Sequence, residues 1–132
     1  MKIRLLESND IKQVVDLWTS SFSGNFNNPI YTNYLNDSNS ITVVMCDEKK
    51  ILGAASLHII KKLTRTLGLI EDVAVSNKFR GLGIGKKLVG KLIQISKEKK
   101  CDKIVLSSSK KNSEFYEKMG FQKKEFSMVL RN

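Results

Sequence analysis

The residues with the clearest chemical potential lie between Leu69 and Gly85, where the chain reads LIEDVAVSNKFRGLGIG. An apolar stretch with two adjacent carboxylates, Glu71 and Asp72, leads into a short turn rich in glycine. Glycines at such a junction let backbone amides approach an anionic ligand, because no Cβ intervenes. The free N–H groups of a following helix would then bind a phosphate or pyrophosphate. The alternative is a tight strand–helix turn that binds nothing.

The spacing of these glycines excludes two common phosphate-binding patterns. No Lys-Ser or Lys-Thr closes the turn as a P-loop requires, and the third glycine of GxGxxG would fall at Lys86. Instead, Arg80, Gly83 and Gly85 stand in the order R-x-x-G-x-G, which resembles the coenzyme A signature of the GNAT superfamily of N-acetyltransferases. The segment Asn112–Phe121 (NSEFYEKMGF) is similar to a second signature of that superfamily, an asparagine followed by a tyrosine and then by x-x-x-Gly-Phe.

The resemblance covers residues 41–132 well and 1–20 loosely, and it implies acetyl-CoA as the acyl donor. Backbone amides after Asp72 would bind the pantetheine arm and polarise the thioester carbonyl, and the glycine turn would bind the phosphates. Ser107 stands where the family tends to carry aspartate. The implied coenzyme contacts are Val73, Ala74, Val75, Arg80, Gly81, Leu82, Gly83, Ile84, Gly85, Lys86, Ser107, Asn112 and Tyr116, with Lys87 as a further cation.

Acetyl transfer from a thioester needs a neutral amine, stabilisation of an oxyanion and a proton for the departing thiolate. By resemblance, Glu71 or Asp72 accepts the ammonium proton, directly or through water. We favour Glu71, because only one of two neighbours can face the cleft in a strand without a bulge. Tyr116 is the candidate acid, since a phenol pKa of about 10 suits a thiol leaving group. A salt-bridged acid pair and a buried structural tyrosine are the alternatives, and Asn112 either caps its helix or binds the coenzyme.

Several strings are similar to those of superfamily members that acetylate glucosamine 6-phosphate on the route to UDP-N-acetylglucosamine. They are Ile70–Val75, Cys101–Leu106, Phe115–Lys118 and Met128–Arg131, in that order. The acceptor site that this likeness implies comprises Lys62, Arg65, Glu71, Asp72, Asp102, Lys103 and Arg131, with the cations binding the phosphate. It also implies a homodimer in which Arg131 crosses the interface. Another small amine or a protein amine is the alternative acceptor, and a coenzyme A sensor without catalysis is a third hypothesis.

The elements that must position these residues are strands and helices in mixed order. We expect strands at 2–6, 41–46, 51–60, 67–75, 103–106 and 122–131, and helices at 11–18, 84–99 and 110–118, with a short one near 30–35. The helix at 84–99 is the clearest, because Ile84, Leu88, Leu92 and Ile95 form one apolar stripe. The order predicts one α/β (α+β) domain over residues 1–132. The resemblance implies the GNAT fold, a mixed, mostly antiparallel sheet of about six to seven strands flanked by helices.

Composition narrows the classes of function. The 132 residues are 41% hydrophobic and 27% charged, which suits a globular fold. The net charge of +10 arises in residues 61–132, with +11 against −1 for residues 1–60. A solvated lysine-rich surface accounts for it without nucleic acid, because no binding motif accompanies the charge. Two distant cysteines and one histidine predict neither a disulfide framework nor a metal site. With no secretory signal and no spanning run, we expect a cytoplasmic protein with a small-molecule substrate and no membrane partner.

Overall fold

The computed structural model describes residues 1–22 and 30–132, and the strands in them form one mixed sheet. The order is β1-β2-β3-β4-β5. The strands are β1 (Lys2–Leu5), β2 (Ser40–Asp47), β3 (Lys50–Lys61), β4 (Thr66–Val75) and β5 (Lys103–Val105). The first four run antiparallel to their neighbours, whereas β4 and β5 are parallel. A parallel pair needs a crossover, and α2 (Ile84–Glu98) supplies it.

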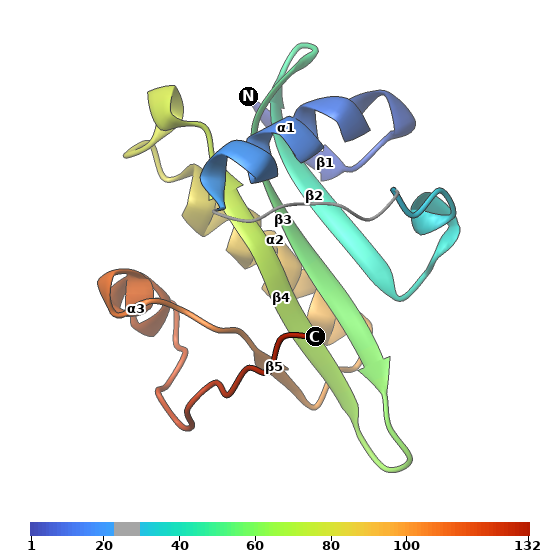
Figure 1. Ribbon diagram of the computed structural model, residues 1–132, viewed down its shortest axis with the longest axis vertical. Helices are drawn as coiled ribbons and strands as arrows, with labels where there is room; N and C mark the ends of the chain where they lie inside the picture. The colour runs from blue at the N-terminus through green and yellow to red at the C-terminus, as the bar shows by residue number, and fades with distance from the viewer. Residues whose placement is uncertain (23–29) are drawn as a thin grey trace.

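Helices cover both faces of the sheet (Figure 1). On one face α1 (Ile11–Ser21) packs Val14 against Val44. On the other face α2 contributes Leu88 and Leu92 to the larger core, which also contains Val43 of β2. Successive strand residues point to opposite faces, so even-numbered side chains of β2 face α1 and odd-numbered ones face α2. The remaining helix is α3 (Lys110–Glu117), and short 3₁₀ turns occupy Ser8–Asp10, Tyr34–Asn36 and Asn77–Phe79.

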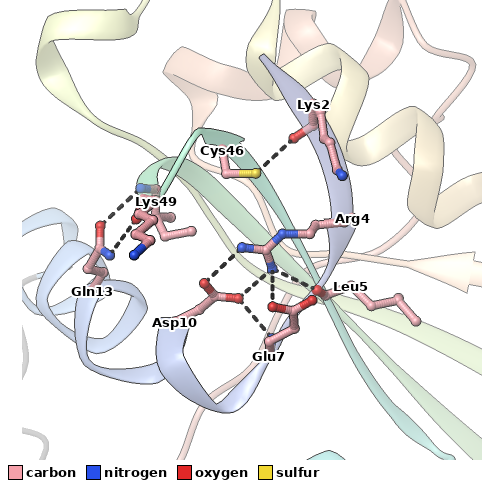
Figure 2. Close-up of polar contacts among 9 residues, drawn as sticks. Lys2, Arg4, Leu5, Glu7, Asp10, Gln13, Cys46 and Lys49 are labelled. Carbon is pink, nitrogen blue, oxygen red and sulfur yellow. Dashed lines mark hydrogen bonds and ion pairs between the residues drawn. The ribbon is translucent and has the colours of Figure 1, made fainter.

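An ion pair fixes the start of α1 to the sheet (Figure 2). Arg4 on β1 donates from its two terminal nitrogens to Asp10 Oδ2 and Oδ1, at 2.6 and 3.0 Å. Asp10 also accepts from the Glu7 amide at 2.8 Å. The Arg4 guanidinium therefore holds the pKa of the Asp10 carboxyl below its usual range. Gln13 donates to the Lys49 carbonyl in the turn before β3 and accepts from the Ile51 amide of β3, so α1 is positioned from two sides.

Two sequence predictions differ from the structure. The strand expected at 122–131 is wrong: those residues carry no regular structure, and the sheet of the described residues has five strands rather than six to seven. Phe126, Met128 and Leu130 alternate as in a strand, yet each is at least 90% exposed. A strand needs a neighbour with free backbone groups, and sequence alternation cannot supply one.

The short helix expected near 30–35 is a 3₁₀ turn that starts only at Tyr34. Residues 23–29, which precede this region, lie outside the described residues. The other expected strands and helices are confirmed to within a few residues. In the described parts of the chain, no helix has the length and apolar character that a bilayer span requires.

Candidate active site

The two candidate acids lie at a bulge in β4. A single residue of β3, Ala55, lies opposite two residues of β4, Asp72 and Val73. Asp72 has φ of 57°, in the left-handed region that few residues other than glycine adopt. The extra residue interrupts the alternation of faces and turns the strand. The premise that only one of Glu71 and Asp72 can face the cleft, which holds for a regular strand, therefore does not apply here.

The environment of these acids favours their protonated forms. Partial burial raises the pKa of Glu71, and the neighbouring charge of Asp72 raises it further. Burial also raises the pKa of Asp72. The charge of His58 on β3 lowers both pKa values and so opposes these effects. A carboxylate with a raised pKa is a stronger base, which suits removal of a proton from an ammonium group.

Beside the bulge, β4 presents an open edge. β5 pairs with β4 only from Leu67 to Leu69, so residues 70–75 have no strand on that side within the described chain. Figure 1 shows β5 beside the first part of β4, after which the chain leads away to α3. On the other side, Ala74 and Val75 keep register partners on β3, whereas Val73 at the bulge has none. An extended ligand can bind such an edge through backbone hydrogen bonds, as an added strand would.

The glycine turn leads directly into α2. Gly81 and Gly83 have φ of 81° and 79°, and nothing lies within 4 Å of where a Cβ would be. Gly83 is the N-cap residue, and its carbonyl accepts the first helical hydrogen bond from the Lys87 amide at 3.1 Å. The amides of residues 84–86 consequently have no partner inside the helix and form the positive end of its dipole. This arrangement suits a phosphate or pyrophosphate.

The residues around the turn differ in what they can offer to a ligand. Ile84 is only 2% exposed and packs in the core, so its amide alone is available. Leu82 and Lys86 are exposed. Arg80 donates from Nε to the Val75 carbonyl at 3.3 Å, which fixes the guanidinium between the end of β4 and the turn. Arg80 and the exposed Lys86 are therefore the cations that this turn can offer to an anionic ligand.

Tyr116 lies on α3 between two other aromatic rings. Its ring meets Phe115 and Phe121 edge to face, with centroids 4.9 and 5.9 Å away. Burial raises the pKa of the phenol, which therefore stays protonated at neutral pH. The Phe115 ring lies 3.5 Å from where a Cβ of Gly85 would be, so α3 packs beside the first turn of α2. The structure thus brings Tyr116 to the side of the glycine turn.

Asn112 and Ser107 are two predicted coenzyme contacts near α3. Ser109, not Asn112, is the N-cap of α3: its hydroxyl accepts from the Asn112 amide at 3.3 Å. The capping alternative for Asn112 is therefore wrong, and its exposed side chain leaves coenzyme binding as the open prediction. Ser107, just after β5, donates to the Ser127 hydroxyl at 3.4 Å. That contact holds the C-terminal segment against the end of β5.

The predicted acceptor cations are spread out within one chain. Lys62 and Arg65 form the turn between β3 and β4, where the Lys62 amide donates to the Arg65 carbonyl at 2.8 Å. From Thr66, the next residue, to Glu71 is about 17 Å along a strand. Arg131 lies near the end of the exposed C-terminal segment. The structure does not bring these three cations together with the acids in a single chain.

Asp102 and Lys103 lie at the same end of the sheet. The Asp102 carboxylate accepts from the Thr66 amide at 2.7 Å, and its own amide donates to the Thr66 carbonyl at 2.8 Å. These bonds fasten the start of β4 to β5, a structural task that the sequence did not indicate. Lys103 pairs in register with Leu67 and is exposed.

Sequence reasoning missed a polar cluster on the sheet face that carries Glu71. Ser56 lies directly opposite Glu71, and residues paired in this way share one face. The Thr42 hydroxyl on β2 lies 2.8 Å from that of Ser56 and 2.7 Å from that of Tyr34. His58 follows on the same face of β3. The sequence feature that could have indicated this cluster is a pair of polar residues two positions apart in each of two otherwise apolar strands.

A mixed, mostly antiparallel sheet with a bulge in its fourth strand, a parallel strand pair that separates beside the bulge and a glycine turn before the crossover helix together define a class of protein. Residues 11–121 match the model of the acetyltransferase (GNAT) family. The chain belongs to this family, and the predicted fold class is confirmed.

The names of curated relatives are more specific than the name of the family. The chain is 45% identical over 95 residues to a glucosamine 6-phosphate N-acetyltransferase of Trypanosoma brucei brucei, covering 68% of this chain and 65% of the relative. It is 42% identical over 82 residues to the enzyme of that name from Arabidopsis thaliana, covering 60% and 55%. The matched region therefore spans less than two thirds of these relatives.

Solved structures of relatives superpose on nearly the whole of this chain. A Trypanosoma brucei acetyltransferase aligns with a TM-score of 0.87 at 35% identity, covering 99% of both chains. The glucosamine-6-phosphate N-acetyltransferase of Arabidopsis thaliana aligns with a TM-score of 0.88 at 31% identity, covering 98% of this chain and 97% of that one.

Proposed function

We propose that this protein transfers the acetyl group of acetyl-CoA directly to the amine of glucosamine 6-phosphate, a step toward UDP-N-acetylglucosamine in the cytoplasm. One observation carries the proposal: the acid pair at the bulge of β4 adjoins an open strand edge that leads straight to the glycine turn. A base, a binding edge for a thioester arm and an anion site thus follow one another along the chain. The names of the relatives support the acceptor.

The donor side would be held mainly by backbone groups. Val73–Val75 offer the open edge to the pantetheine arm, and the free amides of residues 84–86 would bind the diphosphate together with Arg80 and Lys86. Acetyl-CoA supplies the thioester whose carbonyl carbon the amine attacks. The amide of Val73, which has no register partner on β3, would stabilise the oxyanion that develops there.

Two side chains would move protons. Glu71, whose pKa is raised, would take the proton from the ammonium group so that the amine can attack, and Asp72 would hold the same group in place. Tyr116, whose phenol stays protonated, would donate to the departing thiolate. Direct transfer needs no acyl-enzyme. Cys101 lies at Gly68 beneath the start of β4, and burial raises the pKa of its thiol.

Binding of the acceptor phosphate would require cations near the acids, and a single chain does not bring its candidate cations together there. A homodimer in which Arg131 reaches the partner's site would supply one, and the exposed apolar residues Phe126, Met128 and Leu130 offer a surface that a second copy could cover. Lys62, Arg65 and Lys103, at the same end of the sheet, are the other candidates, with Asp102 beside them. The basic half of the chain favours a phosphorylated acceptor over a polyamine, which would need an acidic cleft.

A thiol-release assay with acetyl-CoA and a panel of amines tests the proposal. We expect rapid release with glucosamine 6-phosphate and much slower release with glucosamine, because only the first engages the cations. Equal rates with the two acceptors would contradict the sugar phosphate and favour another small amine. Preference for a peptide amine would favour the protein-acceptor alternative, and binding of coenzyme A without any transfer would indicate a sensor.

A further inference from the structure

The polar cluster on the α1 side of the sheet contains the single histidine of the chain, His58, beside the acid pair. His58 is two residues from Ser56, which lies opposite Glu71, so His58 occupies the diagonal position across the strand pair. Side chains in diagonal positions of one face can interact when one of them is long or aromatic. The effect of His58 on both carboxyl groups of the pair agrees with this proximity.

The ring of His58 is held by a short relay of hydrogen bonds. The Ser40 hydroxyl donates to Asp37 Oδ2 at 3.1 Å and lies 3.4 Å from His58 Nδ1. A serine hydroxyl has one proton, and Ser40 gives it to Asp37, so Nδ1 must be the donor toward Ser40. The neutral ring therefore carries its proton on Nδ1, and Nε2 is the atom that gains the second proton.

A second contact fixes the other side of the ring. The Tyr34 ring meets His58 edge to face, with centroids 6.4 Å apart, and the Tyr34 hydroxyl bonds to Thr42. The titratable or charged groups on this side include Glu71 and Asp72 from β4, Asp37 before β2, Tyr34 from the 3₁₀ turn, Lys103 two strands away on β5 and the Arg4–Asp10 ion pair two strands away on the β1 side. Among these groups the carboxylates outnumber the cations.

We infer that His58 is a positioning residue of the acceptor site: Asp37 and Ser40 orient its ring, and its positive charge keeps the Glu71 carboxylate ionised and ready to accept a proton. The inference rests on the proposed function. A positive charge on His58 lowers the pKa of the Glu71 carboxyl group, so it would keep Glu71 ionised at lower pH and extend activity toward acid pH.

The test compares His58→Asn with His58→Lys. Asparagine keeps an N–H group for Ser40 and removes the charge, whereas lysine restores the charge without the ring. Side-chain ¹³C NMR would follow the titration of the Glu71 and Asp72 carboxyl groups, and the pH profile of kcat/KM for acetyl transfer would be measured on the same proteins. We expect His58→Asn to move the Glu71 midpoint and the acid limb of the profile up by about one pH unit. His58→Lys should reverse most of both shifts.

Ser40→Ala provides a second variant that leaves the ring in place. It should move the acid limb in the same direction by a smaller amount, because the ring loses its orientation but keeps its charge. A Glu71 midpoint equal in wild type and His58→Asn, or raised alike by asparagine and lysine, would overturn the inference. So would a shifted midpoint with an unmoved acid limb. If the wild-type protein transferred acetyl to no amine, the proposed function itself would fail.

Discussion

The donor side and the acceptor side of the candidate active site are built in different ways. The donor side is local: β4, the glycine turn and the first turn of α2 follow one another within residues 66–86, and their backbone amides are already in place. The acceptor side combines residues far apart in the chain. Ser40, His58 and Glu71 meet only through the register of three strands.

Because the two sides are built differently, they recognise different features of their ligands. Backbone amides at a helix start bind any phosphate of suitable size, so the donor side fits a common carrier. Side chains from several strands set distances between a base and charged partners, and those distances decide which amine reacts. Substitutions on the acceptor side should therefore change activity more than those on the donor side, where many weak contacts share the binding.

The largest effect is expected for Glu71→Gln, which removes the candidate base while keeping size and polarity. kcat/KM should fall by about 10²–10⁴-fold, the range for lost general base catalysis. Because burial and Asp72 raise the pKa of Glu71, the wild-type rate should rise with pH through an acid limb above 4.5, the usual carboxyl value, and then level off.

The matched control for this variant is Glu114→Gln, an exposed acid on α3 whose ion pair is with Lys118. It should leave the rate near that of wild type. If Asp72→Asn lost more activity than Glu71→Gln, the roles of the two acids at the bulge would be exchanged.

Tyr116→Phe is expected to have the next largest effect. The ring and its contacts with Phe115 and Phe121 remain, and only the proton donor is lost. Turnover should drop by about 10²-fold, whereas the affinity for coenzyme A should hardly change. Stopped-flow measurement of thiol release and calorimetric titration with coenzyme A separate the two quantities. Wild-type turnover would mean that the aromatic cluster is purely structural.

These two sides were also unequally predictable from the sequence. The strand, the glycine turn and the helix after it are adjacent in the chain, so spacing alone placed Gly83 at the helix start. The bulge at Asp72 could not be predicted, because it depends on which residue of β3 lies opposite. The sequence indicates no role for His58 beside the acids, since its link to Asp37 through Ser40 exists only once β2 and β3 pair.

Arg131→Ala tests whether the acceptor side extends beyond one chain. Loss of a charge-assisted contact to the 6-phosphate should raise KM for glucosamine 6-phosphate by about 10- to 150-fold, equivalent to about 1.5–3 kcal/mol. KM for acetyl-CoA should stay constant, and an unphosphorylated amine should show no defect. Lys124→Ala, another cation of the same segment, is the control. An equal defect with both amines, together with a loss of dimer in light scattering, would assign Arg131 to the interface instead.

The smallest effect is expected on the donor side, for Gly85→Ala. Gly85 lies in the first turn of α2 without a left-handed φ, and an added Cβ would meet the Phe115 ring at 3.5 Å and Val75 at 3.8 Å, which are ordinary contacts. The folded protein should therefore tolerate the methyl group, and alanine should stabilise the helix by up to about 1 kcal/mol. The methyl group would nevertheless occupy the space between α2, β4 and α3 where the coenzyme phosphates are expected. We predict that the Kd for coenzyme A, measured by calorimetry, rises about tenfold, equivalent to about 1.4 kcal/mol.

Gly90→Ala is the matched control, because it adds the same methyl group to the same helix in open space. If Gly85→Ala and Gly90→Ala bound coenzyme A equally well, the glycine at position 85 would serve the helix rather than the ligand, and the donor side would not depend on close backbone approach at that residue.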